Sequence, residues 1–225
     1  NNLSYLDKII NVGMDELTNE EVLAISRNFD KFYCALGIHP LEEGNIDSIF
    51  KLAQYSENKN RIVALGETGL DTKKELKPQI KKCIETIELA NFLKLPIIIH
   101  SNNTNKKVLS LLKERPAQYG FVFHCFQPNL LDLEEIIRRD GFISVGTPIT
   151  YPSAKRSLEV VKNIPLDQLL IELDYPYMCE NPIVEGKNVF NKIRELRNLE
   201  YEELETILDS NAKRLFKNLK NSRKS

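Results

Sequence analysis

The stretch "RIVALGETGLD", residues 61–71, does most to predict the fold, because it joins a buried strand to two acids. Its apolar half is continuous and rich in β-branched residues, which is typical of a strand buried on both faces in a parallel sheet. Gly66 and Glu67 follow at once, and Gly69 and Asp71 come next. We therefore predict a strand that ends at Glu67, then a tight turn at the glycines. The acids either cap this turn in solvent or belong to a functional site.

Six other short apolar runs have the same character as residues 61–67. They are residues 8–14, 32–38, 95–100, 121–124, 141–146 and 169–173. Between them lie amphipathic helical patterns, at residues 19–29, 78–93, 105–114, 130–139, 154–164 and 188–196, and a closing helix starts near Tyr201. Strands that alternate with helices, with no linker rich in Gly, Ser or Pro, predict a single α/β domain over residues 1–225.

The number of strands bears on which α/β fold this is. A closed (β/α)8 barrel needs eight strands, and seven are visible. An open doubly wound sheet has no fixed number, but it usually carries a Gly-rich phosphate loop after its first strand. The run "NVGMDELTNEE" has a single glycine, so that loop is absent.

Composition limits the partners and the compartment. The chain has 225 residues with a formal net charge of −1 and is 42% hydrophobic, which is ordinary for a globular protein and gives no global basic field. A polyanion would have to be bound locally. The four cysteines lie far apart in the sequence, which predicts reduced thiols and a cytoplasmic location. No apolar run has the length of a membrane span, so we expect no membrane partner.

Four residues with metal-binding side chains lie at or just after predicted strand ends: Glu67, His100, His124 and Asp174. Each alone reads as a cap or a hydrogen-bonded structural residue. In a parallel barrel, however, all carboxyl ends of strands face one mouth, and two imidazoles with two carboxylates suit zinc or manganese. Their joint placement favours a metal site. Asp174 could also take a proton from a water that the metal activates. His39, after the run 32–38, is a candidate for binding a substrate anion.

Five motifs occur in the order and at the intervals of a known family: "ALGETGLD", "LPIIIHS", "FHCF", "GFISVG" and "LLIELDYPYM". Over residues 8–216 the chain resembles the TatD-type metal-dependent deoxyribonucleases. The resemblance implies an amidohydrolase-like (β/α)8 TIM barrel with two divalent ions, zinc, magnesium or manganese, that activate water to cut phosphodiester bonds. It implies that Glu67 is shared between two metals, that His100 and His124 are ligands, and that Asp174 binds metal and orients or deprotonates the water.

Three further residues match family positions close to the site. They are His39, Asp71 and Glu172. The resemblance implies that they contact the substrate or hydrogen-bond to the metal ligands. Other positions depart from the family. Asn102 stands where an Arg is usual, and the substrate-side loop is reduced to "NPIVEGKN", residues 181–188. Both changes make the substrate less certain than the metal chemistry.

The largest departure is at the start of the chain. Family members open with a strand that ends in His-x-His, and this sequence contains no such pair. The strand at 8–14 matches the second strand of the family, which explains a count of seven. Either an upstream segment precedes Asn1, which the lack of an initiator Met favours, or the barrel is degenerate and binds one metal at best.

The leading functional prediction is therefore a metal-dependent hydrolase that cleaves DNA as its substrate, at 3′ ends or in single strands, with no obligatory protein partner. Two alternatives stay open at this point. One is a related amidohydrolase that acts on an amide, ester or lactone. The other is a non-catalytic barrel used for binding.

Overall fold

The computed structural model describes residues 6–55 and 57–219. Within them, seven β-strands alternate with eight α-helices, as the sequence predicts for the α/β class. The chain divides into two compact units: unit 1 comprises Asn1–Phe121 and Leu215–Ser225, and unit 2 comprises Val122–Arg214. Each unit is described by itself. The first five residues of the predicted N-terminal remnant lie outside the described residues.

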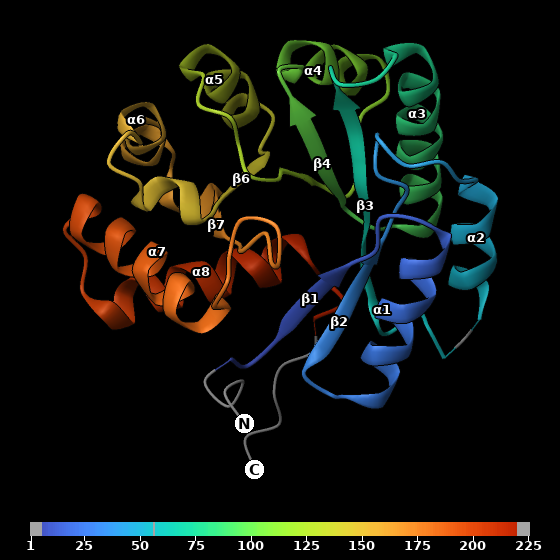
Figure 1. The fold of residues 1–225 in the computed structure, drawn as a ribbon, viewed down its shortest axis with the longest axis horizontal. Helices are drawn as coiled ribbons and strands as arrows, with labels where there is room; N and C mark the ends of the chain where they lie inside the picture. Colours follow the sequence, from blue (N-terminus) through green and yellow to red (C-terminus); the bar gives the residue numbers. More distant parts are fainter. Residues whose placement is uncertain (1–5, 56, 220–225) are drawn as a thin grey trace. The chain divides into compact units, whose positions relative to one another are not determined.

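Unit 1 is built from four strands and the helices that follow them. Its elements are β1 (Ile9–Val12), α1 (Glu16–Asn28), β2 (Phe32–Leu36), α2 (Ile46–Gln54), β3 (Ile62–Asp71), α3 (Leu76–Leu93), β4 (Ile97–Asn102) and α4 (Asn105–Glu114). Strands β1 to β4 pair in parallel in chain order. Helix α1 packs on β2 and α3 on β3, while α2 contacts both of these helices (Figure 1).

Local capping explains where two helices of unit 1 begin. Asp15 accepts a hydrogen bond from the Thr18 N–H at 2.7 Å, and the Thr18 hydroxyl accepts from the Asp15 N–H at 3.0 Å. This reciprocal pair satisfies backbone donors at the start of α1. Helix α2 is not among the helices predicted from sequence. Its signal is Asn45, whose side chain accepts from the Asp47 N–H and caps the helix.

Strand β3 corrects the prediction that the strand ends at Glu67. It continues to Asp71, and every residue in it is buried. After a register shift between Leu65 and Thr68, pairing with β4 resumes at Thr68 and ends with Asp71 opposite Asn102. Glu67 therefore lies inside the strand, because the second half of β3 finds a partner strand. His100 likewise lies inside β4 and not at its end.

The two glycines of β3 also have a different role from the predicted turn. Gly66 and Gly69 have φ values of +136° and +140° within the extended strand. A Cβ on Gly66 would lie 2.4 Å from the Ile98 carbonyl oxygen, and a Cβ on Gly69 would lie 2.0 Å from that of His100. Glycine is required here because it allows the backbones of β3 and β4 to approach closely.

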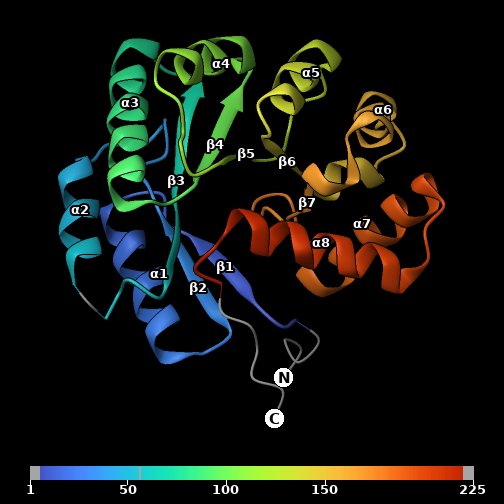
Figure 2. The ribbon, with the colours of Figure 1, turned by 180° about the vertical axis from the view of Figure 1, so that it is seen from behind.

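Unit 2 contains the later strand–helix repeats. Its elements are β5 (Phe121–Phe123), α5 (Leu130–Arg138), β6 (Phe142–Val145), η1 (Thr147–Thr150), α6 (Lys155–Asn163), η2 (Leu166–Gln168), β7 (Leu169–Ile171), α7 (Pro182–Arg197) and α8 (Tyr201–Leu215). Strands β5, β6 and β7 pair in parallel. Helix α5 packs on β6, and α7 contacts β7, η1 and α6 (Figure 2).

The segment 181–188 is not the reduced loop that the sequence predicts. Asn181 accepts hydrogen bonds from the N–H groups of Ile183 and Val184, and α7 begins at Pro182. An Asn cap followed by Pro in the first turn is a typical helix start. The residues after the cap are thus the first turns of a helix.

The seven predicted strands are confirmed, because each apolar run overlaps one of the strands β1 to β7. None of the four cysteines is paired in a disulfide, in agreement with the expected thiols. Among residues 6–55 and 57–219, no helix is long and apolar enough to cross a membrane.

Candidate metal centre

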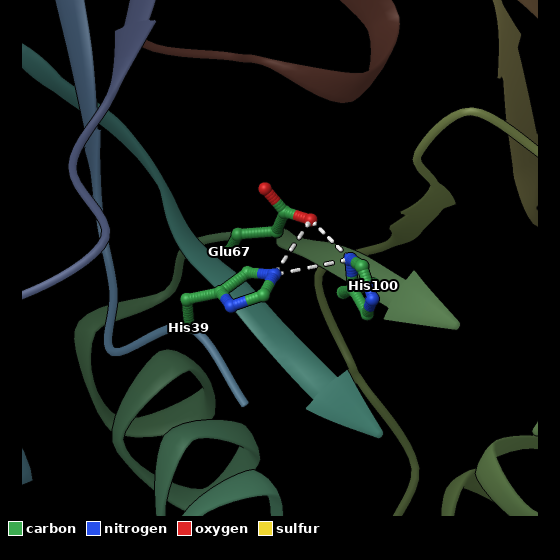
Figure 3. Close-up of side chains that lie close together, drawn as sticks. All are labelled: His39, Glu67 and His100. Atoms are coloured by element: carbon green, nitrogen blue, oxygen red, sulfur yellow. Dashed lines mark hydrogen bonds and ion pairs between the residues drawn. The ribbon is translucent and has the colours of Figure 1, made fainter. Parts of the chain in front are cut away.

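Three side chains of unit 1 point toward one another: Glu67 from β3, His100 from β4 and His39 from the loop after β2 (Figure 3). Glu67 Oε1 lies 2.7 Å from His100 Nδ1 and 3.8 Å from His39 Nε2, and the two nitrogens are 3.2 Å apart. These three atoms all lie within 4.8 Å of one another. Two imidazole nitrogens and a carboxylate oxygen at such spacing fit a divalent ion such as zinc.

The irregular pairing of β3 with β4 places Glu67 in this group. The register shift lies between Leu65 and Thr68, at the position of Glu67. Irregularities of this kind re-aim a side chain in an otherwise regular strand. The carboxylate, whose residue is only 8% exposed, lies against His100 as a result.

Asp71 holds the far side of the His100 ring. Its Oδ2 lies 2.9 Å from His100 Nε2. Both Asp71 oxygens accept from the Asn102 amide at 3.2 Å, and Oδ1 also accepts from the Lys73 N–H at 2.8 Å. A carboxylate behind a histidine fixes the ring and directs the other nitrogen to the metal. The geometry therefore supports His100 as a ligand through Nδ1.

The charges around His100 favour its protonated form when no ion is bound. Burial alone would lower the pKa of His100, but the hydrogen bonds and charges of Glu67 and Asp71 outweigh burial and raise it. Burial likewise opposes the shift of Asp71, whose pKa is lowered by hydrogen bonds from Lys73, His100 and Asn102. A divalent ion at Nδ1 would compete with a proton for this nitrogen.

His39 differs from His100 in the proton that it presents. Its Nδ1 accepts a hydrogen bond from the Leu41 N–H at 3.2 Å. Burial lowers the pKa of His39; the charge of Glu67 opposes this shift, and that of His100 adds to it. A neutral ring whose Nδ1 is an acceptor carries its proton on Nε2. His39 thus turns Nε2 toward Glu67 and His100, and its contact with a substrate anion stays a prediction.

A second histidine–carboxylate pair lies in unit 2. His124 directly follows β5, and its Nδ1 lies 2.6 Å from Glu172 Oε2, one residue past β7. Glu172 also accepts from the Cys125 N–H at 2.6 Å and from the Ser144 hydroxyl at 2.7 Å. This carboxylate contacts Nδ1 of His124 as Asp71 contacts Nε2 of His100, an arrangement typical of the support of a metal-binding histidine. Asp174, three residues past β7, is half-buried, and its carbonyl accepts from the Met178 N–H at 2.7 Å.

The structure thus assembles the predicted residues in two sets. Unit 1 brings together His39, Glu67, Asp71 and His100, and unit 2 pairs His124 with Glu172. The joining of His124 and Asp174 with the ligands of unit 1 stays a prediction. The sequence interpretation missed the supporting contacts of Asn102 and Ser144. The signal for Asn102 was its place two residues after His100, on the same face of the strand.

Parallel β/α units that bring imidazoles and carboxylates together are typical of the class of metal-dependent barrel hydrolases. A family model described as TatD related DNase matches residues 4–217 of the chain. The chain therefore belongs to the TatD-related DNase family. The expected resemblance is confirmed over nearly the whole sequence.

Relatives and solved structures agree with this family. The chain is 34% identical to the uncharacterized metal-dependent hydrolase YabD of Bacillus subtilis, over 94% of this chain and 88% of that protein. The crystal structure of YjjV, a TatD homologue from Escherichia coli, is 32% identical in sequence and matches with a TM-score of 0.85. The match covers 94% of this chain and 86% of YjjV. A TatD family hydrolase from Entamoeba histolytica shares the fold, with 20% sequence identity and a TM-score of 0.79. The match covers 95% of this chain and 85% of that protein. The protein is a metal-dependent hydrolase with a TIM-barrel fold.

Proposed function

We propose that this hydrolase is a deoxyribonuclease that cleaves phosphodiester bonds at 3′ ends or in single-stranded DNA. The observation that carries the proposal is His100, held between Asp71 on one side and Glu67 on the other. This arrangement prepares an imidazole nitrogen and a carboxylate to bind one divalent ion. The family description, TatD related DNase, supports DNA as the substrate.

Glu67, His100, His124 and Asp174 are the residues proposed to hold the metal. When bound, a divalent ion supplies Lewis acidity toward phosphoryl oxygens and lowers the pKa of water toward neutrality. It also provides positive charge at the substrate, which the net charge of −1 does not. A donor set of two imidazoles and two carboxylates suits zinc or manganese. A set of oxygen donors alone would suit these ions less well.

The surrounding residues each have a defined task in this proposal. Asp71 keeps His100 in one orientation, and Glu172 does the same for His124. Asp174 accepts a proton from the attacking water. His39 donates its Nε2–H to an oxygen of the phosphodiester, where negative charge develops as the bond breaks.

Thiol chemistry is a poor alternative for the two most buried cysteines. Burial raises the pKa of Cys34 to about 11 and that of Cys83 to about 12. A thiolate is the nucleophilic form, so these groups stay inert near neutral pH. The four cysteines, none of which forms a disulfide, also agree with the cytoplasmic location that we propose.

Activity assays on the metal-free protein test this function. We expect hydrolysis of 3′-labelled single-stranded DNA only after Zn²⁺, Mn²⁺ or Mg²⁺ is added, and less hydrolysis of blunt duplex DNA. Metal uptake with turnover of p-nitrophenyl acetate but not of DNA would favour an amidohydrolase. A protein that takes up no metal and cleaves neither substrate would be a non-catalytic barrel, and the proposal would be wrong.

A further inference from the structure

A lysine on α3 binds the turn that carries His39. The Lys82 ammonium donates to the carbonyl oxygens of His39, Pro40 and Glu42, at 3.2, 3.5 and 2.5 Å. An ammonium has three N–H donors, so these three carbonyls match its full capacity. The side chain lies on the wall of a groove of about 1000 Å³ that the same turn forms with α2 and α3.

A second lysine completes this contact. Lys74, in the loop between β3 and α3, donates to the carbonyl oxygen of Leu41. Two ammonium groups thus donate hydrogen bonds to the carbonyl oxygens of four consecutive residues, 39–42. Hydrogen bonds from a charged donor to carbonyl oxygens are stronger than those between neutral groups, so they stabilise this turn. Lys82 is half-buried, and burial together with the charge of Lys74 lowers its pKa.

This turn also supplies the backbone N–H that contacts His39 Nδ1. The Leu41 N–H that donates to His39 Nδ1 belongs to the turn, as does the Glu42 N–H, which donates to the His39 carbonyl at 2.9 Å. If the carbonyls lost their lysine partners, the turn would rearrange and Leu41 would move off Nδ1. The Nε2–H would then no longer be specified.

We propose that Lys82 is a positioning residue for His39: it holds the turn so that Nδ1 of the ring lies on the Leu41 N–H and Nε2 lies toward Glu67 and His100. The consequence for catalysis rests on the proposed function, in which His39 contacts the substrate. Lys82 itself binds backbone carbonyls and acts only through the turn. Lys74 has a weaker effect, because it is exposed and binds a single carbonyl.

Nitrogen-15 NMR of the imidazole rings tests this inference directly. The chain has three histidines, so the spectrum contains three rings, and His39→Gln identifies the signals of His39. In metal-free protein near pH 8, where a neutral imidazole dominates, we expect His39 as the Nε2–H tautomer. Lys82→Met should abolish this preference and give a mixture of tautomers, whereas Lys82→Arg should retain it, because a guanidinium also offers several donors.

Lys81→Met is the matched control. Lys81 precedes Lys82 on α3, is exposed, and pairs with Glu85 at 3.7 Å. We expect the His39 spectrum to be unchanged in this variant. An equal change in Lys81→Met and Lys82→Met would overturn the proposal, because the effect would then be one of charge and not of the contact with the turn.

A kinetic readout separates positioning from general stability. With single-stranded DNA, Lys82→Met should raise KM roughly two- to tenfold, the loss of one hydrogen bond, and leave metal affinity unchanged. If the wild type neither binds metal nor cleaves DNA, the proposed function fails, yet the NMR result still decides the role of Lys82.

The result that would overturn the inference is a folded Lys82→Met protein with the wild-type His39 tautomer. If Lys82→Met does not fold, Lys82→Ala is measured instead, since it likewise lacks every side-chain N–H donor. An unchanged His39 signal in that variant contradicts the proposal equally.

Discussion

His100 shows how individual contacts prepare a ligand before any ion binds. Its two ring nitrogens face different carboxylates, Glu67 Oε1 at 2.7 Å and Asp71 Oδ2 at 2.9 Å. Both acids are nearly buried, and Asp71 is further held by Asn102 and Lys73. Two buried carboxylates orient this ring, and burying them costs free energy. A histidine with a purely structural role does not require two buried acids.

The first prediction concerns Asp71. Asp71→Asn keeps the shape of the side chain but removes the charge that orients His100. We expect the affinity for Zn²⁺ to fall by about 10- to 100-fold, as measured by calorimetric titration. Asp30→Asn is the control, because Asp30 is an exposed acid of the same unit. Equal zinc affinities in the Asp71 variant and the wild type would show that Asp71 does not support a ligand.

The second prediction concerns Glu67. Glu67→Ala removes the only carboxylate of the three-residue group around His39 and His100. We expect it to abolish metal-dependent hydrolysis while the circular dichroism spectrum stays that of a folded protein. The exposed Glu88→Ala should keep full activity. Retained turnover in Glu67→Ala would mean that the metal centre lies elsewhere.

At the scale of elements, the pair β3 and β4 places the site. Glu67 and Asp71 come from one strand, and His100 and Asn102 from the other, so the register of this pair sets their distances. The sequence predicts both strands but not the register, because a run of buried residues does not specify its partner. This is why the predicted end of β3 at Glu67 was wrong.

The third prediction tests the close approach of these strands. Gly69→Ala puts a Cβ 2.0 Å from the His100 carbonyl oxygen at a φ of +140°. We expect a loss of stability on the order of 3 kcal/mol or more in urea denaturation. In the control, Gly186→Ala in α7, the Cβ meets only the end of the Leu173 side chain at 3.3 Å. Helix propensity should stabilise that variant by up to about 1 kcal/mol. Similar stabilities for the two variants would contradict the packing assigned to Gly69.

At the scale of the whole molecule, metal binding should be linked to folding. An ion that binds only the folded state at 100 times its Kd adds about 2.7 kcal/mol to the free energy of unfolding. We therefore expect Zn²⁺ or Mn²⁺ to raise the thermal midpoint and EDTA to reverse the rise. The shift should be absent in Glu67→Ala. An unchanged thermal midpoint of the wild type in the presence of Zn²⁺ or Mn²⁺ would argue against a preformed metal site.

The parts of this structure that sequence predicts are those with a local signal. The seven apolar runs predict the seven strands, and the ordered motifs predict the family. Helix α2 and the start of α7 were missed because their signals are single Asn caps, at Asn45 and Asn181. The contacts of Lys82 with the His39 turn have no local signal at all, since they join residues about 40 positions apart. Such contacts exist only once the helix has packed.

The measurement that tests the central claim most directly is anomalous diffraction from crystals of this protein grown with Zn²⁺ or Mn²⁺. The account predicts a peak about 2.0–2.2 Å from Glu67 Oε1 and His100 Nδ1, with His124 and Asp174 completing the ligands. No peak at Glu67 and His100, or an ion bound only by other residues, would contradict the assignment of this site.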